Sequence, residues 1–155
     1  MLRMIEIEKS FNIGTINEKE IFKGLNLTIN DGDFITVIGG NGAGKSTMLN
    51  LIAGVHKADG GRIILDGEDL TYKNETQRAK YIGRVFQDPM MGTAPTMMIE
   101  ENLAMAYRRT KRRTLAWGIS QKEREMYKES LAQLGLGLED RMKTKVGLLS
   151  GGQRQ

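Results

Sequence analysis

A glycine-rich stretch in the first third of the chain carries the clearest chemistry in the sequence. Residues 39–46 read Gly-Gly-Asn-Gly-Ala-Gly-Lys-Ser and match the pattern G-x-x-x-x-G-K-[ST], with Thr47 directly after it. Glycines let the backbone curl tightly, so that successive N–H groups point inward and can bind an anion. An apolar β-branched run precedes the stretch and a helical run follows it, as a phosphate-binding loop requires.

The side chains of this loop extend the prediction to a nucleotide and its metal ion. Lys45 is placed to reach the β- and γ-phosphates, where it would also act in catalysis, and the Ser46 hydroxyl is placed to bind Mg²⁺. The residues predicted to bind ATP and Mg²⁺ here are Gly39, Asn41, Gly42, Ala43, Gly44, Lys45, Ser46 and Thr47. The alternative is a glycine turn with an incidental Lys-Ser pair. The loop alone leaves the protein class open, because kinases, GTPases, motors and recombinases share it.

Two further segments carry polar groups that suit a phosphate or a metal ion. Ser150-Gly151-Gly152 can open a helix, with a hydroxyl and bare N–H groups at its positive end. Gln87 follows a predicted strand and precedes Pro89, so its carbonyl can bind Mg²⁺ and its amide can orient water. The alternatives are a flexible Gly-Gly loop and an ordinary polar loop residue.

The elements that must position these groups follow from the spacing of apolar residues. Alternation of apolar and polar residues predicts half-exposed strands at 2–8 and 21–29. Residues 34–38 are mostly apolar and β-branched without alternation, which is typical of a strand buried on both faces of a parallel sheet. The remaining predictions are strands at 62–65 and 82–86, and a helix at 48–53 that ends at Gly54.

From about residue 96 the sequence changes to helical spacing. Apolar residues recur at the interval of a helix face, namely Ile99, Leu103, Ala106 and Tyr107. Ser120 and Glu123 fit a capping box at the start of another helix, which Gly135 would end. The chain is therefore predicted as an α/β protein with a nucleotide-binding core at 1–89 and a helical part at 90–155.

Composition narrows the protein class. The chain has 155 residues, of which 39% are hydrophobic and 27% charged, which suits a globular domain with a core of its own. Cysteine is absent, which excludes disulfides and thiolate metal sites. No apolar run approaches the roughly 18 residues that span a bilayer, and the N-terminus lacks the apolar region of a signal peptide. The net charge of +4 does not by itself indicate nucleic-acid binding.

Two other features are less specific. Basic residues cluster at Arg108, Arg109, Lys111, Arg112 and Arg113. This cluster could contact anionic lipid or a partner, or it could be a solvated loop between helices, which is the more usual role of a short charge run. His56 matches no motif and is interpreted as a surface loop residue.

Several segments resemble motifs of the ABC ATPases, in the order in which that family carries them. Residues 149–155, Leu-Ser-Gly-Gly-Gln-Arg-Gln, resemble its signature motif, and residues 85–89, Val-Phe-Gln-Asp-Pro, resemble its Q-loop. Residues 64–67, Ile-Leu-Asp-Gly, resemble a turn of its antiparallel subdomain. Phe11 lies where the family usually carries an aromatic residue against adenine, although tyrosine is commoner there. The resemblance covers essentially the whole chain.

The resemblance implies an ATP-binding subunit that works as a head-to-tail dimer. The signature residues would face the γ-phosphate held by a second ATPase subunit, and they are Ser150, Gly151, Gly152 and Gln153. Gln87 would bind Mg²⁺, act in catalysis and link to the region that touches membrane subunits. Phe11 would stack on the base. The other implied partners are membrane-spanning permease subunits and a solute-binding protein, with the chain on the cytoplasmic side of the membrane and without nucleic acid.

The implied fold is a P-loop NTPase core of ABC type, with an antiparallel β subdomain and a helical subdomain. The family's Walker B strand, D-loop and switch histidine would follow residue 155, so these residues alone are expected to bind ATP but to hydrolyse it poorly or not at all. Residues 86–140 are similar to a bacterial importer subgroup of amino-acid transporters that includes tryptophan and tyrosine types. The implied function is an ATPase that powers uptake. The alternatives are a non-transport ABC ATPase acting on nucleic acid or ribosomes, and a small-molecule kinase, against which the signature motif argues.

Overall fold

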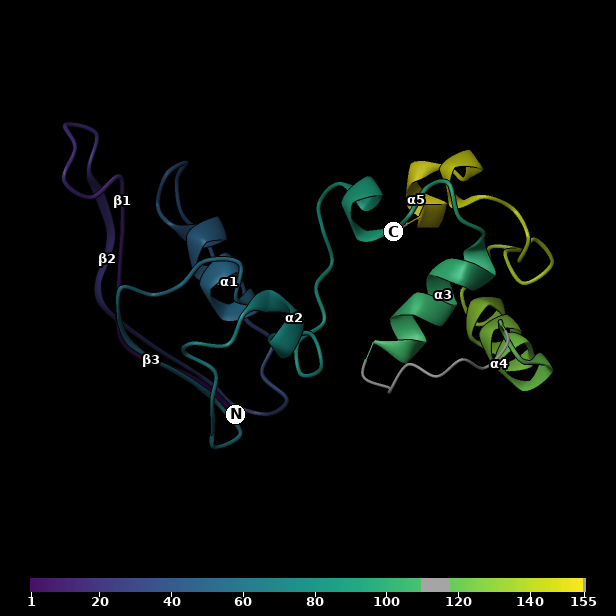
Figure 1. Ribbon diagram of the computed structural model, residues 1–155, viewed down its shortest axis with the longest axis horizontal. Helices are drawn as coiled ribbons and strands as arrows, with labels where there is room; N and C mark the ends of the chain where they lie inside the picture. Colours follow the sequence, from purple (N-terminus) through teal and green to yellow (C-terminus); the bar gives the residue numbers. More distant parts are fainter. Residues whose placement is uncertain (110–117, 155) are drawn as a thin grey trace. The chain divides into compact units, whose positions relative to one another are not determined.

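A computed structural model describes residues 1–109 and 118–154, in two compact units, Met1–Ile82 and Gly83–Gln155 (Figure 1). The first unit combines a sheet with two helices, and the second is helical. The elements of the first unit are β1 (Leu2–Phe11), β2 (Lys19–Ile29), α1 (Lys45–Ala53), β3 (Gly60–Leu65), β4 (Glu68–Asp69) and α2 (Glu75–Arg78). The elements of the second are η1 (Pro89–Gly92), α3 (Ile99–Arg108), α4 (Gln121–Ala132), η2 (Val146–Leu148) and α5 (Gly151–Arg154).

The sheet of the first unit has the order β2-β1-β3-β4, and every neighbouring pair is antiparallel. β1 and β2 run along each other from Leu2↔Ile29 to Phe11↔Lys19, with bulges between. The strands predicted at 2–8, 21–29 and 62–65 are confirmed. Asp66 and Gly67, both with positive φ, form the two-residue turn that joins β3 to β4, because such turns need left-handed residues.

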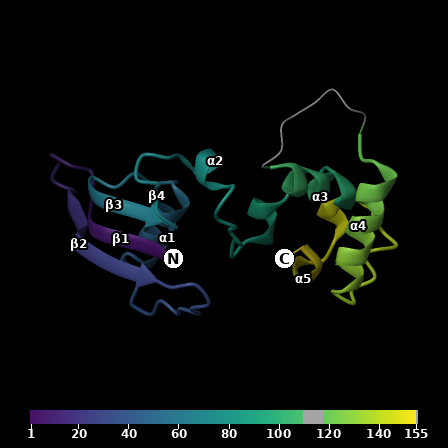
Figure 2. The same cartoon turned by 90° about the horizontal axis from the view of Figure 1, so that it is seen from below.

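Alternating side chains of this sheet form a core with α1. Figure 2 shows α1 against one face of the sheet, and the buried side chains confirm that contact. The cluster consists of Leu2, Met4, Ile7, Met48, Leu51, Ile63 and Leu70. Each fully buried aliphatic side chain contributes about 1.5–3 kcal/mol through removal from water. The predicted helix at 48–53 is confirmed, although α1 begins three residues earlier, at Lys45.

The predicted strands at 34–38 and 82–86 are wrong. Both segments lack strand structure, and several of their apolar side chains face solvent: Phe34 is 96% exposed, Ile38 89% and Val85 78%. A β-branched run becomes a strand only when a neighbouring strand pairs with its backbone. Within residues 1–109 and 118–154, the named strands pair only with one another in the antiparallel sheet, and none pairs with either segment.

The second unit packs around its own apolar cluster, formed by Ile99, Ala104, Tyr127, Leu131, Leu138, Met142, Val146 and Leu149. The predicted capping box at the start of α4 is confirmed: the Ser120 N–H donates to Glu123 Oε2 at 2.8 Å, and the Glu123 N–H donates to Ser120 Oγ at 3.3 Å. Gly135, with φ of 65°, follows the end of α4. In the part of the chain that the structure describes, no helix has the length and apolar character to cross a membrane.

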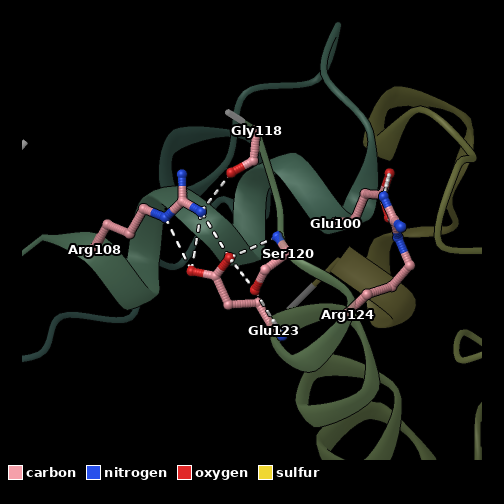
Figure 3. A network of polar contacts seen from close by, with 6 residues as sticks. All are labelled: Glu100, Arg108, Gly118, Ser120, Glu123 and Arg124. Atoms are coloured by element: carbon pink, nitrogen blue, oxygen red, sulfur yellow. Dashed lines mark hydrogen bonds and ion pairs between the residues drawn. The ribbon is translucent and has the colours of Figure 1, made fainter. Parts of the chain in front are cut away.

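Glu123 also ties α3 to α4 through Arg108 (Figure 3). Arg108 Nη2 donates to Glu123 Oε2 at 2.8 Å and to the Gly118 carbonyl at 2.7 Å. Arg108 first, and Ser120 second, lower the pKa of the Glu123 carboxyl from 4.5 to about 2. Arg108 therefore forms an ion pair, so the basic cluster is not simply a solvated loop at this residue. Three members of the basic cluster, Lys111, Arg112 and Arg113, lie outside the described residues.

The stability of the second unit is expected to fall as the pH drops from about 4.5 to about 2. The folded state holds the pKa of Glu123 below its unfolded value, so its contribution is complete above the unfolded pKa and is lost as Glu123 becomes protonated. Denaturant unfolding followed by circular dichroism at several pH values in this window measures the loss. Glu123→Gln should remove this part of the pH dependence, whereas Glu129→Gln, at an exposed position of α4, should retain it. Equal slopes in the two variants would contradict the assignment.

Candidate functional site

The glycine-rich loop leads directly into the first turn of α1. Gly42 and Gly44 have φ of 81° and 88°, in the left-handed region that favours glycine. The Ala43 N–H donates to the Gly40 carbonyl at 3.3 Å, which closes the loop, and the Met48 N–H donates to the Gly44 carbonyl at 2.8 Å, which begins the helix. The predicted turn and the predicted helix start are thus one continuous structure.

β2 holds this loop against the sheet. A β-carbon at Gly44 would lie 2.8 Å from Ile21 Cγ2 and 2.9 Å from Phe22 Cζ, both on β2. Such contacts are too short for any side chain, so only glycine allows this approach. The close contact fixes the loop relative to a strand that packs against the core through Phe22, Leu25, Leu27 and Ile29.

Lys45 folds back over the loop. Its Nζ donates to the Gly39 carbonyl at 2.6 Å and to the Gly40 carbonyl at 2.8 Å. The first turn of α1 contains no acidic residue, so the ammonium group and the positive end of the helix lie together without a neutralising carboxylate in that turn. An arrangement of this kind suits a polyphosphate, which would replace carbonyl oxygens as the acceptor for Lys45.

The hydroxyl of Ser46 is the metal-binding group that the loop offers. Ser46 is exposed at the first turn of α1, beside the half-buried Lys45 and Thr47. Among residues 1–109 and 118–154, no group of three or more His, Cys, Asp or Glu side chains could hold a metal ion. A single hydroxyl fits Mg²⁺ that arrives with a nucleotide, because this ion keeps waters and takes most other oxygens from phosphates.

Arg78 supports the other end of α1, a role that no sequence pattern indicated. Its side chain is 1% exposed and donates to four carbonyls. Nη1 reaches Leu51 O at 2.5 Å and Ile52 O at 2.8 Å, Nη2 reaches Thr71 O at 3.2 Å, and Nε reaches Lys73 O at 2.8 Å. Burial lowers the pKa of Arg78, and Asp69 opposes this shift. A cation therefore caps the C-terminal carbonyls of the helix that begins at Lys45.

Phe11 ends β1 in a small polar and aromatic cluster. Its ring meets the His56 ring edge-on, with centroids 5.3 Å apart, and Lys9 Nζ lies 5.2 Å from the Phe11 centroid. Asp59 accepts from Lys9 Nζ at 2.8 Å and from the Ser10 N–H at 2.7 Å. His56 is half-buried on Phe11, so its interpretation as a plain surface loop residue was incomplete.

The other predicted residues belong to the second unit. Gln87 is exposed, one residue before Asp88, whose side chain accepts from the Met90 N–H at 2.9 Å and so begins η1. Ser150, Gly151 and Gly152 are exposed at the start of the short helix α5. The Ser150 N–H donates to Gln153 Oε1 at 3.3 Å.

The second unit also contains a cavity of about 410 Å³ with a charged lining, and the residues around it are Glu100, Arg124, Lys128, Glu139, Asp140, Arg141, Met142, Lys143 and Thr144. None of the predicted site residues is among them. The Glu100–Arg124 ion pair at its edge, 2.7 Å long, joins α3 to α4 (Figure 3). The cavity is therefore no evidence for a nucleotide site.

Comparison with known proteins identifies relatives along the whole chain. A family model described as "ABC transporter" matches residues 22–155. The chain is 39% identical, over its full length, to the tyrosine transport ATP-binding protein of Clostridioides difficile. It is 36% identical, also over its full length, to the spermidine/putrescine import ATP-binding protein PotA of Pasteurella multocida. It spans 61% of the first relative and 37% of the second.

Solved structures agree with the sequence relatives. A dimeric ATP-binding cassette in a post-hydrolysis state, bound to ADP and phosphate, superposes with a TM-score of 0.79 at 27% identity, over 99% of this chain and 65% of that one. A nucleotide-free ATP-binding cassette from an ABC transporter gives a TM-score of 0.72 at 31% identity, over 99% and 60% of the two chains. The α/β fold predicted from the sequence, with its antiparallel sheet and helical part, is confirmed.

Proposed function

The chain belongs to the ABC transporter family, and we propose that it is the ATP-binding part of a subunit that powers amino-acid uptake. The observation that carries the proposal is the loop at 39–47, in which Lys45 lies over two carbonyls at the start of α1. The proposal of an amino acid as substrate rests on the relative named for tyrosine transport, which is 39% identical. The PotA relative, at 36% identity, is named for spermidine/putrescine import, so the proposed substrate class follows the relative with the higher identity.

In this proposal the loop holds ATP and Mg²⁺. Backbone N–H groups of residues 39–47 bind the phosphates, and Lys45 turns from the Gly39 and Gly40 carbonyls to the β- and γ-phosphates. Ser46 and Gln87 bind the metal ion, and Gln87 also orients water. Phe11, held by His56 on one side, offers its remaining surface to the base.

We assign residues 1–89 to the nucleotide-binding core and residues 90–155 to the helical subdomain of the ABC ATPase. Residues 150–153, of which the first three are exposed, would contact the nucleotide of a second subunit, in keeping with a solved relative that is dimeric. Permease subunits and a solute-binding protein complete the proposed importer, in which this chain lies at the cytoplasmic face of the membrane. Hydrolysis is proposed for the whole protein, and we expect residues 1–155 alone to hydrolyse ATP poorly or not at all.

Ser150→Arg is expected to leave nucleotide binding by one subunit intact and to block ATP-dependent dimerisation of the full-length protein. A long cationic side chain at the exposed start of α5 would occupy the space that the nucleotide of the other subunit needs. Light scattering with ATP under non-hydrolysing conditions measures the dimer. Ser130→Arg, at an exposed position of α4, is the matched control and should dimerise normally. Normal dimerisation of Ser150→Arg would count against the proposed role.

Co-purification separates transport from the alternative of a nucleic-acid or ribosome-bound ABC ATPase. The proposal expects membrane subunits to accompany the tagged full-length protein in detergent. Salt-dependent binding to nucleic acid, with no membrane subunit present, would instead support the alternative.

A further inference from the structure

Lys19 brings a second ammonium group to the glycine-rich loop. Lys19 opens β2, and its Nζ would lie 3.3 Å from a β-carbon at Gly42. The side chain therefore extends from the strand to the tip of the loop, where Gly42 has positive φ. No motif drew attention to this residue, because it stands apart from the loop in sequence.

The sheet register explains how Lys19 comes to this place. Lys19 pairs with Phe11 across β1 and β2. Two residues further along β2, Ile21 and then Phe22 pack on Gly44. Lys19 is thus fixed by its own strand between the proposed base-stacking ring and the proposed phosphate loop.

The charge around Lys19 is not balanced by the protein. Among residues 1–109 and 118–154, no carboxylate lies within ion-pair distance of Lys19 Nζ or Lys45 Nζ. The first turn of α1 adds its positive end and contains no acidic residue. Two ammonium groups and a helix N-terminus at one loop repel each other, and a bound polyanion relieves that repulsion.

We propose that Lys19 is a nucleotide-binding residue that contacts the polyphosphate and favours nucleotides with more negative charge. This inference rests on the proposed function and adds a second cation to its site. Lys45 contacts the phosphates from within the loop, whereas Lys19 approaches from β2, opposite Phe11 on the neighbouring strand β1. The side chain is exposed, so its contribution is smaller than that of Lys45 and decreases with salt.

The test compares the affinities of ATP, ADP and adenosine for the intact protein by competition with a fluorescent ATP analogue. Lys19→Gln should lower the affinity for ATP by about threefold to fivefold and the affinity for ADP by less, and it should leave the affinity for adenosine unchanged. Lys19→Glu should weaken ATP by roughly tenfold, since it reverses the charge, and Lys19→Arg should restore most of the affinity. Lys23→Gln, at an exposed lysine on the same strand, should change none of them.

The outcomes separate this inference from the function on which it rests. If Lys45→Ala no longer binds ATP while Lys19→Gln binds it with wild-type affinity, the role of Lys19 is refuted and the loop assignment stands. Equal losses for ATP and adenosine would also refute it, because they would show an effect on the base or on the fold. If the unaltered protein does not bind ATP, both proposals are overturned.

Discussion

Replacing Lys45 with alanine is expected to abolish nucleotide binding. In the structure the Lys45 ammonium group donates to two loop carbonyls, at 2.6 and 2.8 Å, and these are the contacts that phosphate oxygens would take over. Charge-assisted hydrogen bonds to phosphate are among the strongest that a side chain makes. We expect at least about a 100-fold loss in ATP affinity, which corresponds to about 2.7 kcal/mol. Isothermal titration calorimetry with ATP and Mg²⁺ measures it.

The same variant should fold normally. Gly39 and Gly40 are exposed, so their carbonyls can bond to water when the ammonium group is removed. Thermal unfolding should therefore shift little, which separates lost binding from lost structure. Lys57→Ala, at an exposed lysine beyond the end of α1, is the matched control and should retain affinity. Unchanged affinity in Lys45→Ala would refute the assignment of the phosphate loop.

Replacing Arg78 with methionine is expected to cause the largest loss of stability in the first unit. The change leaves four buried or half-buried carbonyls without their donor, at the end of α1 and in the segment after β4. Hydrogen bonds from a charged donor contribute about 1.5–3 kcal/mol each but are not additive, so we expect a total loss of about 3–4 kcal/mol. Urea unfolding followed by circular dichroism measures it, as a lower midpoint with a similar slope.

Arg62→Met, at an exposed arginine on β3, is the control for the loss of one positive charge and should stay within about 0.5 kcal/mol. A loss below about 1 kcal/mol in Arg78→Met would show that the guanidinium group does not hold the helix end. Substitution of Gly54 by any larger residue should also destabilise the first unit. A β-carbon there would lie 2.9 Å from Arg78 Cδ, and Gly54 has a φ of 84°.

Local patterns were sufficient for much of the fold. The capping box at Ser120, the helix end at Gly54 and the antiparallel strands each depend on residues close together in sequence. The loop at 39–47 was predictable for the same reason, because its glycines, lysine and helix start are contiguous. ABC family membership, which the motifs suggested, is confirmed by the comparisons.

The wrong and missing predictions all depend on distant partners. The run at 34–38 has the composition of a buried strand, but the strand would need a neighbour that supplies its backbone hydrogen bonds. No sequence pattern indicated the role of Arg78, because its four acceptors lie in two segments, one at the end of α1 and one after β4. Lys19 was missed because only the register of β1 and β2 places it beside Gly42. The roles proposed for Gln87 and residues 150–153 stay predictions, since they concern partners and metal.

The unpaired run before the loop has a consequence for handling the protein. Residues 34–38 present exposed β-branched and aromatic side chains, carry no charge and no proline, and pair with none of the named strands in the described part of the chain. Such a segment is a template for strands of other copies, so these residues in isolation would be prone to aggregate as concentration rises. A charged substitution such as Ile35→Lys is therefore expected to raise solubility.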